Sequence, residues 1–237
     1  MPKWLVRLKG DTFDLEDLPA LLRSPELTIT EENGSYYLES SEFDSLTYAD
    51  EVRERSVALI KMINGAAKLY RDNFRGISED GVIRIEDNGR RHHYIFAEAV
   101  LTARSKLSTN VTVTTSDGTQ VTVNQPSVIE TWLGLAKKYK PVADVLHFSR
   151  ENTWFNLYII FEVIRDDVRG EQIIVKNGWV SDKKLSQFTQ TAQSREALGY
   201  YARHASKKYR SPTPPMSWAE AKSLIKGLIM NWLCTKS

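Results

Sequence analysis

The sequence predicts an α+β protein, with a small N-terminal α+β domain of antiparallel hairpins (residues 1–124) and a C-terminal α-helical bundle (residues 125–237). In the first half, apolar and polar residues alternate around Asn-Gly and Asp-Gly turn signals, which is typical of hairpins. In the second half, apolar residues recur at helical spacing. The net charge also changes sign between the two halves. Residues 1–124 hold 15 basic and 20 acidic side chains, whereas residues 125–237 hold 17 and 10.

The elements of the first half are short and are marked by strong turn signals. Leucines at helical spacing from Asp14 onward predict a short helix, and Asn33-Gly34 predicts a tight hairpin turn. The expected elements, in order, are a strand at 4–8, a helix at 14–22, a hairpin of 27–30 with 36–39, a helix at 48–72, strands at 82–85 and 94–96 joined by Asp87-Asn88-Gly89, and a valine and threonine hairpin at 111–123.

The second half begins near Pro126 and is read as helices. Residues 152–168 are apolar almost all round, which predicts the central helix of a bundle. Ser217 and Glu220 form a capping box at the start of the last helix. Four other helices are expected, at residues 129 to about 139, where Lys140-Pro141 ends the helix, and at 142–148, 182–193 and 195–207. The short apolar segment 173–175 does not show a clear helix or strand pattern.

The sequence lacks the signatures of several functional classes. The single cysteine, Cys234, cannot form an intramolecular disulfide, which favours a reducing compartment. The most apolar segment, residues 154–164, is about half the length that a membrane-spanning helix needs. No glycine-rich phosphate loop, serine-hydrolase elbow or pair of histidines at metal-binding spacing is present. We therefore expect a cytoplasmic protein with no membrane partner, no metal and no cofactor.

One polar constellation interrupts the predicted bundle. Arg203 and His204 are adjacent in a predicted helix, and Glu162 is the only acid within the most apolar stretch of the chain. Because a buried carboxylate needs a partner, we expect Glu162 to pair with Arg203 or His204. Two hypotheses follow. The three residues form either a structural ion pair between two helices or a catalytic site in which His204 transfers protons and Arg203 binds phosphate.

Basic residues are dense near the C-terminus. Residues 195–226 hold seven basic and two acidic side chains, with tyrosines interleaved. Phosphates bind basic groups and bases stack on rings, so this pattern is a candidate nucleic-acid surface. It is also compatible with a solvated helix face or with docking to the acidic run at residues 11–50. The candidate nucleic-acid-binding residues are Arg195, Lys207, Lys208, Tyr209 and Arg210.

The C-terminal half, roughly residues 126–235, resembles the HEPN-like helical domains of bacterial toxin, abortive-infection and antiviral systems. The resemblance rests on the apolar helix 154–162, on Ala202-Arg203-His204-Ala205 and on the helix beginning with residues 215–221. Active members of the superfamily carry Arg, four to six residues, then His, which builds a metal-independent ribonuclease site at a dimer interface. None of the four histidines here has an arginine at that spacing.

The sequence thus leads to three functional hypotheses. The first is a binding or regulatory module of an RNA-related or defence-related bacterial assembly, with RNA, another protein or a second copy of the chain as partner. The second is a divergent metal-independent ribonuclease that uses Arg203 and His204, with Glu162 orienting one of them. The third is a structural scaffold without a ligand.

Overall fold

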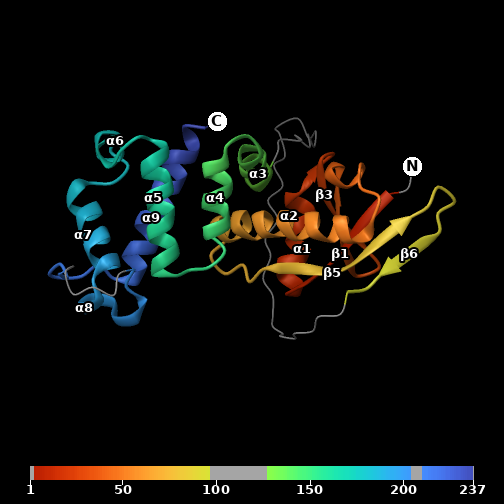
Figure 1. Ribbon diagram of the computed structural model, residues 1–237, viewed down its shortest axis with the longest axis horizontal. Helices are drawn as coiled ribbons and strands as arrows, with labels where there is room; N and C mark the ends of the chain where they lie inside the picture. The colour runs from red at the N-terminus through yellow and green to blue at the C-terminus, as the bar shows by residue number, and fades with distance from the viewer. Residues whose placement is uncertain (1–2, 97–126, 204–209, 237) are drawn as a thin grey trace, which may run out of the picture. The chain divides into compact units, whose positions relative to one another are not determined.

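The computed structural model of the protein describes residues 3–96, 127–203 and 210–236 (Figure 1). An antiparallel six-stranded sheet in the N-terminal part is followed by helices, so the predicted α+β fold class is confirmed. The chain divides into two compact units, residues 1–131 and residues 132–237. The domain boundary expected at residues 124–125 and the hairpin expected at 111–123 lie outside the described residues.

The first unit is built on a sheet in which β1 is central. Its strands are β1 (Lys3–Gly10), β2 (Arg23–Ser24), β3 (Leu27–Glu32), β4 (Ser35–Ser40), β5 (Ile77–Ile85) and β6 (Arg91–Tyr94). Their order is β2-β3-β4-β1-β5-β6, and every neighbouring pair is antiparallel. Val6 of β1 pairs with Leu38 of β4 and Val82 of β5, and all three side chains are fully buried. The predicted alternation in β1 therefore places its apolar side chains in the core.

Two of the predicted turns form as expected. Asn33 and Gly34, between β3 and β4, have φ of 53° and 77°, and a two-residue turn with positive φ at both positions matches the twist of a hairpin. Gly89, between β5 and β6, has φ of 80°. Strand β6 ends at Tyr94, two residues earlier than expected.

Two helices complete the core of the first unit. α1 (Thr12–Leu21) packs against β1 and β3, and α2 (Ala49–Tyr70) packs against β1 and β5. α1 begins two residues before the expected position because Asp11 acts as its cap and accepts a hydrogen bond from the Phe13 backbone N–H. A short 3-10 turn, η1 (Ser41–Phe43), precedes α2.

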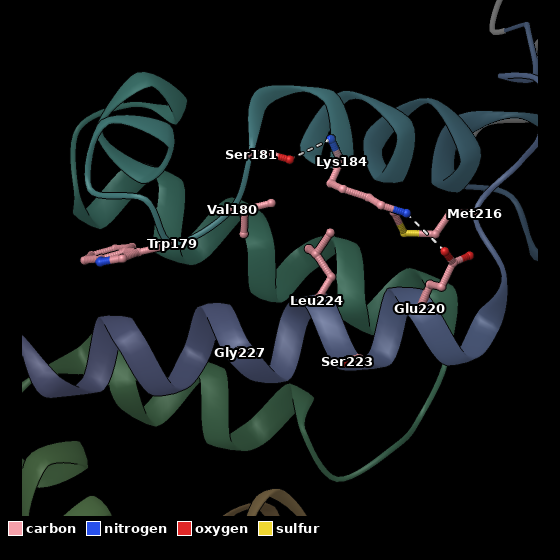
Figure 2. Close-up of a pocket in the computed structure, with 9 residues that line it drawn as sticks. All are labelled: Trp179, Val180, Ser181, Lys184, Met216, Glu220, Ser223, Leu224 and Gly227. Carbon is pink, nitrogen blue, oxygen red and sulfur yellow. Dashed lines mark hydrogen bonds and ion pairs between the residues drawn. The ribbon is translucent and has the colours of Figure 1, made fainter.

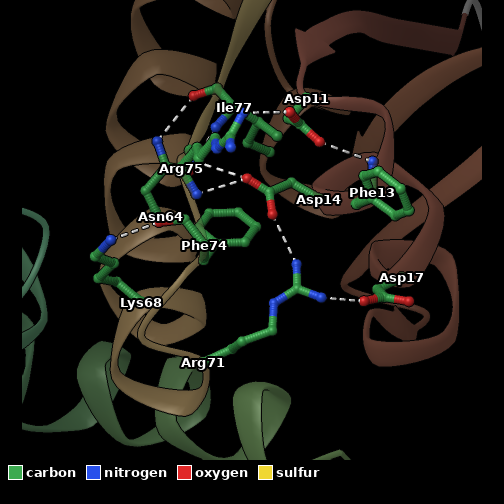
Figure 3. Close-up of polar contacts among 11 residues, drawn as sticks. Asp11, Phe13, Asp14, Asp17, Asn64, Lys68, Arg71, Phe74, Arg75 and Ile77 are labelled. Carbon is green, nitrogen blue, oxygen red and sulfur yellow. Dashed lines mark hydrogen bonds and ion pairs between the residues drawn. The ribbon is translucent and has the colours of Figure 1, made fainter. Parts of the chain in front are cut away.

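A buried carboxylate joins α1 to the segment that follows α2 (Figure 3). Asp14 is 4% exposed, and its Oδ1 accepts a hydrogen bond from Arg71 Nη2 at 2.7 Å. Its Oδ2 accepts the backbone N–H groups of Arg75 at 2.6 Å and Gly76 at 3.2 Å. Arg71 also pairs with Asp17. The turn between α2 and β5 is thus fixed by one acidic side chain of α1.

The acidic run at residues 11–50 is largely neutralised inside the first unit. Six of its eleven carboxylates form ion pairs with basic residues of that unit. The pairs are Asp11–Arg75, Asp14–Arg71, Asp17–Arg71, Glu32–Arg91, Glu39–Lys3 and Glu42–Arg55. These pairs weaken the hypothesis that the run serves as a docking partner for the basic C-terminal residues.

The helical unit contains helices at the segments expected from residue 129 onward, except that only the start of the helix expected at 195–207 forms, and a short helix occupies the ambiguous segment 173–175. They are α3 (Val128–Lys138), which begins in the first unit, α4 (Lys140–Phe148), α5 (Trp154–Asp167), α6 (Glu171–Lys176), α7 (Asp182–Gln193), α8 (Arg195–Leu198) and α9 (Trp218–Cys234). α5 packs against α4, α7 and α9, as expected for the central helix. The Ser217–Glu220 capping box at the start of α9 is present.

Aromatic side chains fill the core between α5, α7 and α9. The fully buried Phe188 ring of α7 lies 6.2 Å from those of Trp154 and Tyr158 and 6.1 Å from that of Phe161, measured between ring centres. Trp218 of α9 meets Trp154 edge-on at 5.6 Å. Rings at these separations add to the stability that buried area alone provides. The apolar character of residues 152–168 therefore reflects burial against three helices.

Candidate functional site

The segment after α7 is the main departure from the predicted helices. Instead of one helix over residues 195–207, the chain forms the four-residue α8 and then the 3-10 turn η2 (Gly199–Tyr201). Gly199 has φ of 60° and ψ of −126°, a conformation that side chains with a Cβ disfavour, and it ends α8. The helix prediction is wrong over residues 199–203, because the conformation of Gly199 ends α8. We call residues 199–203 the tyrosine turn.

Arg203, the last residue of the tyrosine turn, forms a two-pronged ion pair with Glu162 of α5. Its Nη1 donates to Oε1 at 3.1 Å, and its Nη2 lies 2.8 Å from Oε2. Paired contacts of this kind combine charge with fixed geometry. Both side chains are about a quarter exposed, at 26% and 22%. The expected pairing of Arg203 with Glu162 is therefore present.

The guanidinium group of Arg203 also packs against an aromatic ring of α5. The Arg203 guanidinium carbon lies 4.5 Å from the centre of the Tyr158 ring, a cation–π contact. Gln193 Nε2 of α7 donates to the Tyr158 hydroxyl at 2.6 Å, and the Arg203 backbone N–H donates to the Ala192 carbonyl at 2.9 Å. The tyrosine turn is thus held to both α5 and α7.

This arrangement decides what Arg203 can do chemically. Both of its terminal nitrogens interact with Glu162, and a phosphate would have to compete with that carboxylate. Such a geometry favours a structural ion pair over an arginine that stabilises phosphate charge. His204, the third residue of the predicted constellation, lies outside the described residues.

The tyrosine turn presents two exposed rings beside basic residues. Tyr200 is 93% exposed and Tyr201 is 78% exposed. The guanidinium carbon of Arg195, an exposed residue, lies 5.3 Å from the centre of the Tyr200 ring. The Ser211 backbone N–H donates to Glu196 at 3.3 Å, which holds the neighbouring Arg210, also exposed, next to α8. Of the other predicted nucleic-acid contacts, Lys207, Lys208 and Tyr209 lie outside the described residues.

A separate hollow of about 370 Å³ lies between the start of α7 and α9 (Figure 2). Trp179 lies at one end of it, and an ion pair between Lys184 and Glu220 lies at the other, with Nζ and Oε1 3.0 Å apart. Val180 and Leu224 lie between these ends. This hollow could not be predicted from the sequence, because its lining comes from two separate segments, residues 179–184 and 216–227, that share no motif.

Glu220 makes the stability of this end of α9 depend on pH. The Ser217 backbone N–H, then Lys184 and the Ser217 hydroxyl, lower the pKa of Glu220 to about 2. A lowered pKa in the folded state stabilises the fold above the unfolded value near 4.5, and this contribution is lost as the pH falls toward 2. We expect Glu220→Gln to be less stable than the parent at pH 7 in denaturant titrations, with the difference vanishing near pH 2. A difference that does not change with pH would contradict this account.

Within residues 3–96, 127–203 and 210–236, no group of three His, Cys, Asp or Glu side chains is placed to hold a metal ion. None of the helices in the described part of the chain is both long and apolar enough to cross a membrane.

No protein-family model, curated protein or solved structure matches this chain. The contacts of the tyrosine turn and the charge of the segments around it are therefore the basis for a functional proposal.

Proposed function

We propose that the helical unit is an RNA-binding module, acting in the cytoplasm as part of a larger RNA-related or defence-related assembly. The resemblance of its sequence to HEPN-like domains supports the defence-related setting. The excess of basic over acidic side chains in residues 125–237, 17 against 10, supports a polyanionic partner. The first unit, with most of its acidic run already paired, is assigned no part in this binding.

The observation that carries the proposal is the exposure of Tyr200 and Tyr201 beside Arg195. Tyr200 and Tyr201 are adjacent and are 93% and 78% exposed, and exposed apolar groups that lie together support the assignment of a contact surface. Basic groups supply affinity for phosphates, and rings supply stacking for bases. Arg195 contacts the Tyr200 ring, which brings a basic group and a stacking ring together, and Arg210 precedes Ser211, whose backbone N–H donates to Glu196 of α8.

Binding is favoured over cleavage because of the state of Arg203. A ribonuclease of the kind considered above needs an arginine that meets the phosphate, but Arg203 is engaged by Glu162 and lies over Tyr158. The ion pair instead anchors the turn that carries the exposed tyrosines. Arg203 and Glu162 are therefore positioning residues for the binding surface.

The salt dependence of RNA affinity tests this proposal. We expect the full chain to bind a fluorescently labelled RNA in anisotropy titrations at low salt, with affinity that falls as salt rises. Removing one basic group that binds a phosphate should reduce the slope of log affinity against log salt by about 0.7 for a single strand. Arg195→Ala and Arg210→Ala should each reduce the slope by about that amount.

Lys140→Ala provides the matched control, because Lys140 is an exposed cation of the same unit on α4, where it pairs with Asp144. This variant should leave the slope unchanged. No binding at low salt would overturn the proposal and favour a scaffold that binds only protein. Cleavage of the same RNA that His204→Ala abolishes would overturn it in favour of the ribonuclease.

A further inference from the structure

We infer that the RNA is bound as a single strand, with two neighbouring bases stacked on Tyr200 and Tyr201. This inference rests on the proposed function, because it names the form of the nucleic acid that the same surface binds. It depends on three properties of the tyrosine turn, which are the direction of the rings, the rigidity of the backbone and the position of the neighbouring charge.

The direction of the rings follows from the 3-10 geometry of η2. Successive residues of a 3-10 helix are about 120° apart, so Tyr200 and Tyr201 leave the backbone in different directions. Their exposure, 93% and 78%, leaves both rings accessible to solvent. Two accessible rings on adjacent residues provide two separate stacking surfaces.

The backbone that carries the rings is anchored on both sides. Before the turn, the buried Ser194 caps α8, and its Oγ accepts the Ala197 N–H at 3.3 Å. After the turn, Arg203 is held by Glu162 and by the Ala192 carbonyl. A turn anchored in this way keeps the backbone of both tyrosines in place before the ligand arrives, which lowers the entropy cost of binding.

Basic side chains lie beside the α8 end of the tyrosine turn. Arg195 contacts the Tyr200 ring, and Arg210 is held next to α8 through Ser211. A base stacked on Tyr200 would therefore have its phosphate close to a guanidinium group. In a duplex, neighbouring base pairs cover the faces of each base, so stacking on a protein ring requires unpaired bases.

The expected result is a preference for single strands that depends on the rings. Full-length protein is titrated with a labelled single-stranded RNA and with the duplex of the same sequence. We expect tighter binding of the single strand. Tyr200→Ala and Tyr201→Ala should each weaken that binding by about 5- to 150-fold, the range measured when one stacking residue is removed.

Three comparisons separate stacking from other effects. Tyr200→Phe keeps the ring and should retain affinity near that of the parent. Tyr200→Ala should leave the salt slope unchanged, because stacking releases no counterions. Tyr70→Ala, which removes a half-exposed tyrosine of the first unit, should have no effect on affinity.

The outcomes distinguish this inference from the function on which it rests. If the protein binds single strand and duplex equally, and the tyrosine variants bind as the parent does, the inference is wrong while RNA binding stands. If neither RNA binds at low salt, the proposed function fails. Loss of affinity in Tyr200→Phe equal to that in Tyr200→Ala would also contradict stacking, because the hydroxyl would then be the essential group.

Discussion

Replacing Asp14 by alanine is expected to destabilise the first unit by about 3 kcal/mol. The carboxylate is almost fully buried and accepts hydrogen bonds from Arg71 and from the backbone of Arg75 and Gly76. Its removal leaves two partly buried backbone N–H groups without this acceptor and leaves the partly buried Arg71 guanidinium with Asp17 as its remaining acid, and breaking a buried pair in this way costs roughly 3–5 kcal/mol. Denaturant titration measures the loss, and amide hydrogen exchange in β1 and β5 assigns it to this unit.

Asp17→Ala serves as the control for Asp14. Asp17 also pairs with Arg71, but its side chain is 29% exposed and Arg71 keeps Asp14 as a partner in this variant. We therefore expect a clearly smaller loss of stability. If the two variants were equally stable, the central role assigned to Asp14 would be wrong.

Replacing Phe188 by alanine is expected to destabilise the helical unit by about 3–5 kcal/mol. The ring is fully buried and lies against Trp154, Tyr158 and Phe161, so truncation leaves a cavity between α5 and α7. Because Tyr158 is also the platform for Arg203, we expect weaker RNA binding in the same variant. Denaturant titration and RNA anisotropy on the same preparation measure the two effects.

Phe155→Ala, also in the helical unit, provides the comparison for Phe188. Phe155 lies on α5 but is 51% exposed, and substitutions at such positions usually change stability by less than about 0.5 kcal/mol. RNA affinity should also be unchanged. A loss in Phe155→Ala as large as that in Phe188→Ala would contradict the described packing of the aromatic core.

Local signals predicted much of the fold, since the chemistry of each signal acts within a few residues. The dipeptide Asn33-Gly34 predicts the turn between β3 and β4, and the capping box of Ser217 and Glu220 predicts the start of α9. Gly199 shows where such reasoning fails. A glycine within an apolar pattern can lie inside a helix or can terminate it. Contacts with residues that are distant in the sequence decide which of the two occurs.

The candidate site was predictable in part, from the density of basic residues around Arg195 and Arg210 and from a residue that differs in polarity from its neighbours. Glu162 stands out as an acid in an apolar helix, which indicated Arg203 or His204 as a partner, and the structure pairs it with Arg203. The network around Asp14 gave no such signal, because Asp14 and Arg71 are 57 residues apart and each lies in an ordinary polar context. Pairings of this kind depend on how α1 and α2 pack on the sheet.

The most direct test of RNA binding at the tyrosine turn is crosslinking of the complex with ultraviolet light, followed by mass spectrometry. Trypsin cleaves after Arg195 and Arg203, so Tyr200 and Tyr201 fall in one peptide, residues 196–203. We predict that single-stranded RNA crosslinks to this peptide and that the crosslink is lost when both tyrosines are replaced by alanine. Crosslinks confined to the first unit, or to parts of the helical unit away from α8, would contradict the account.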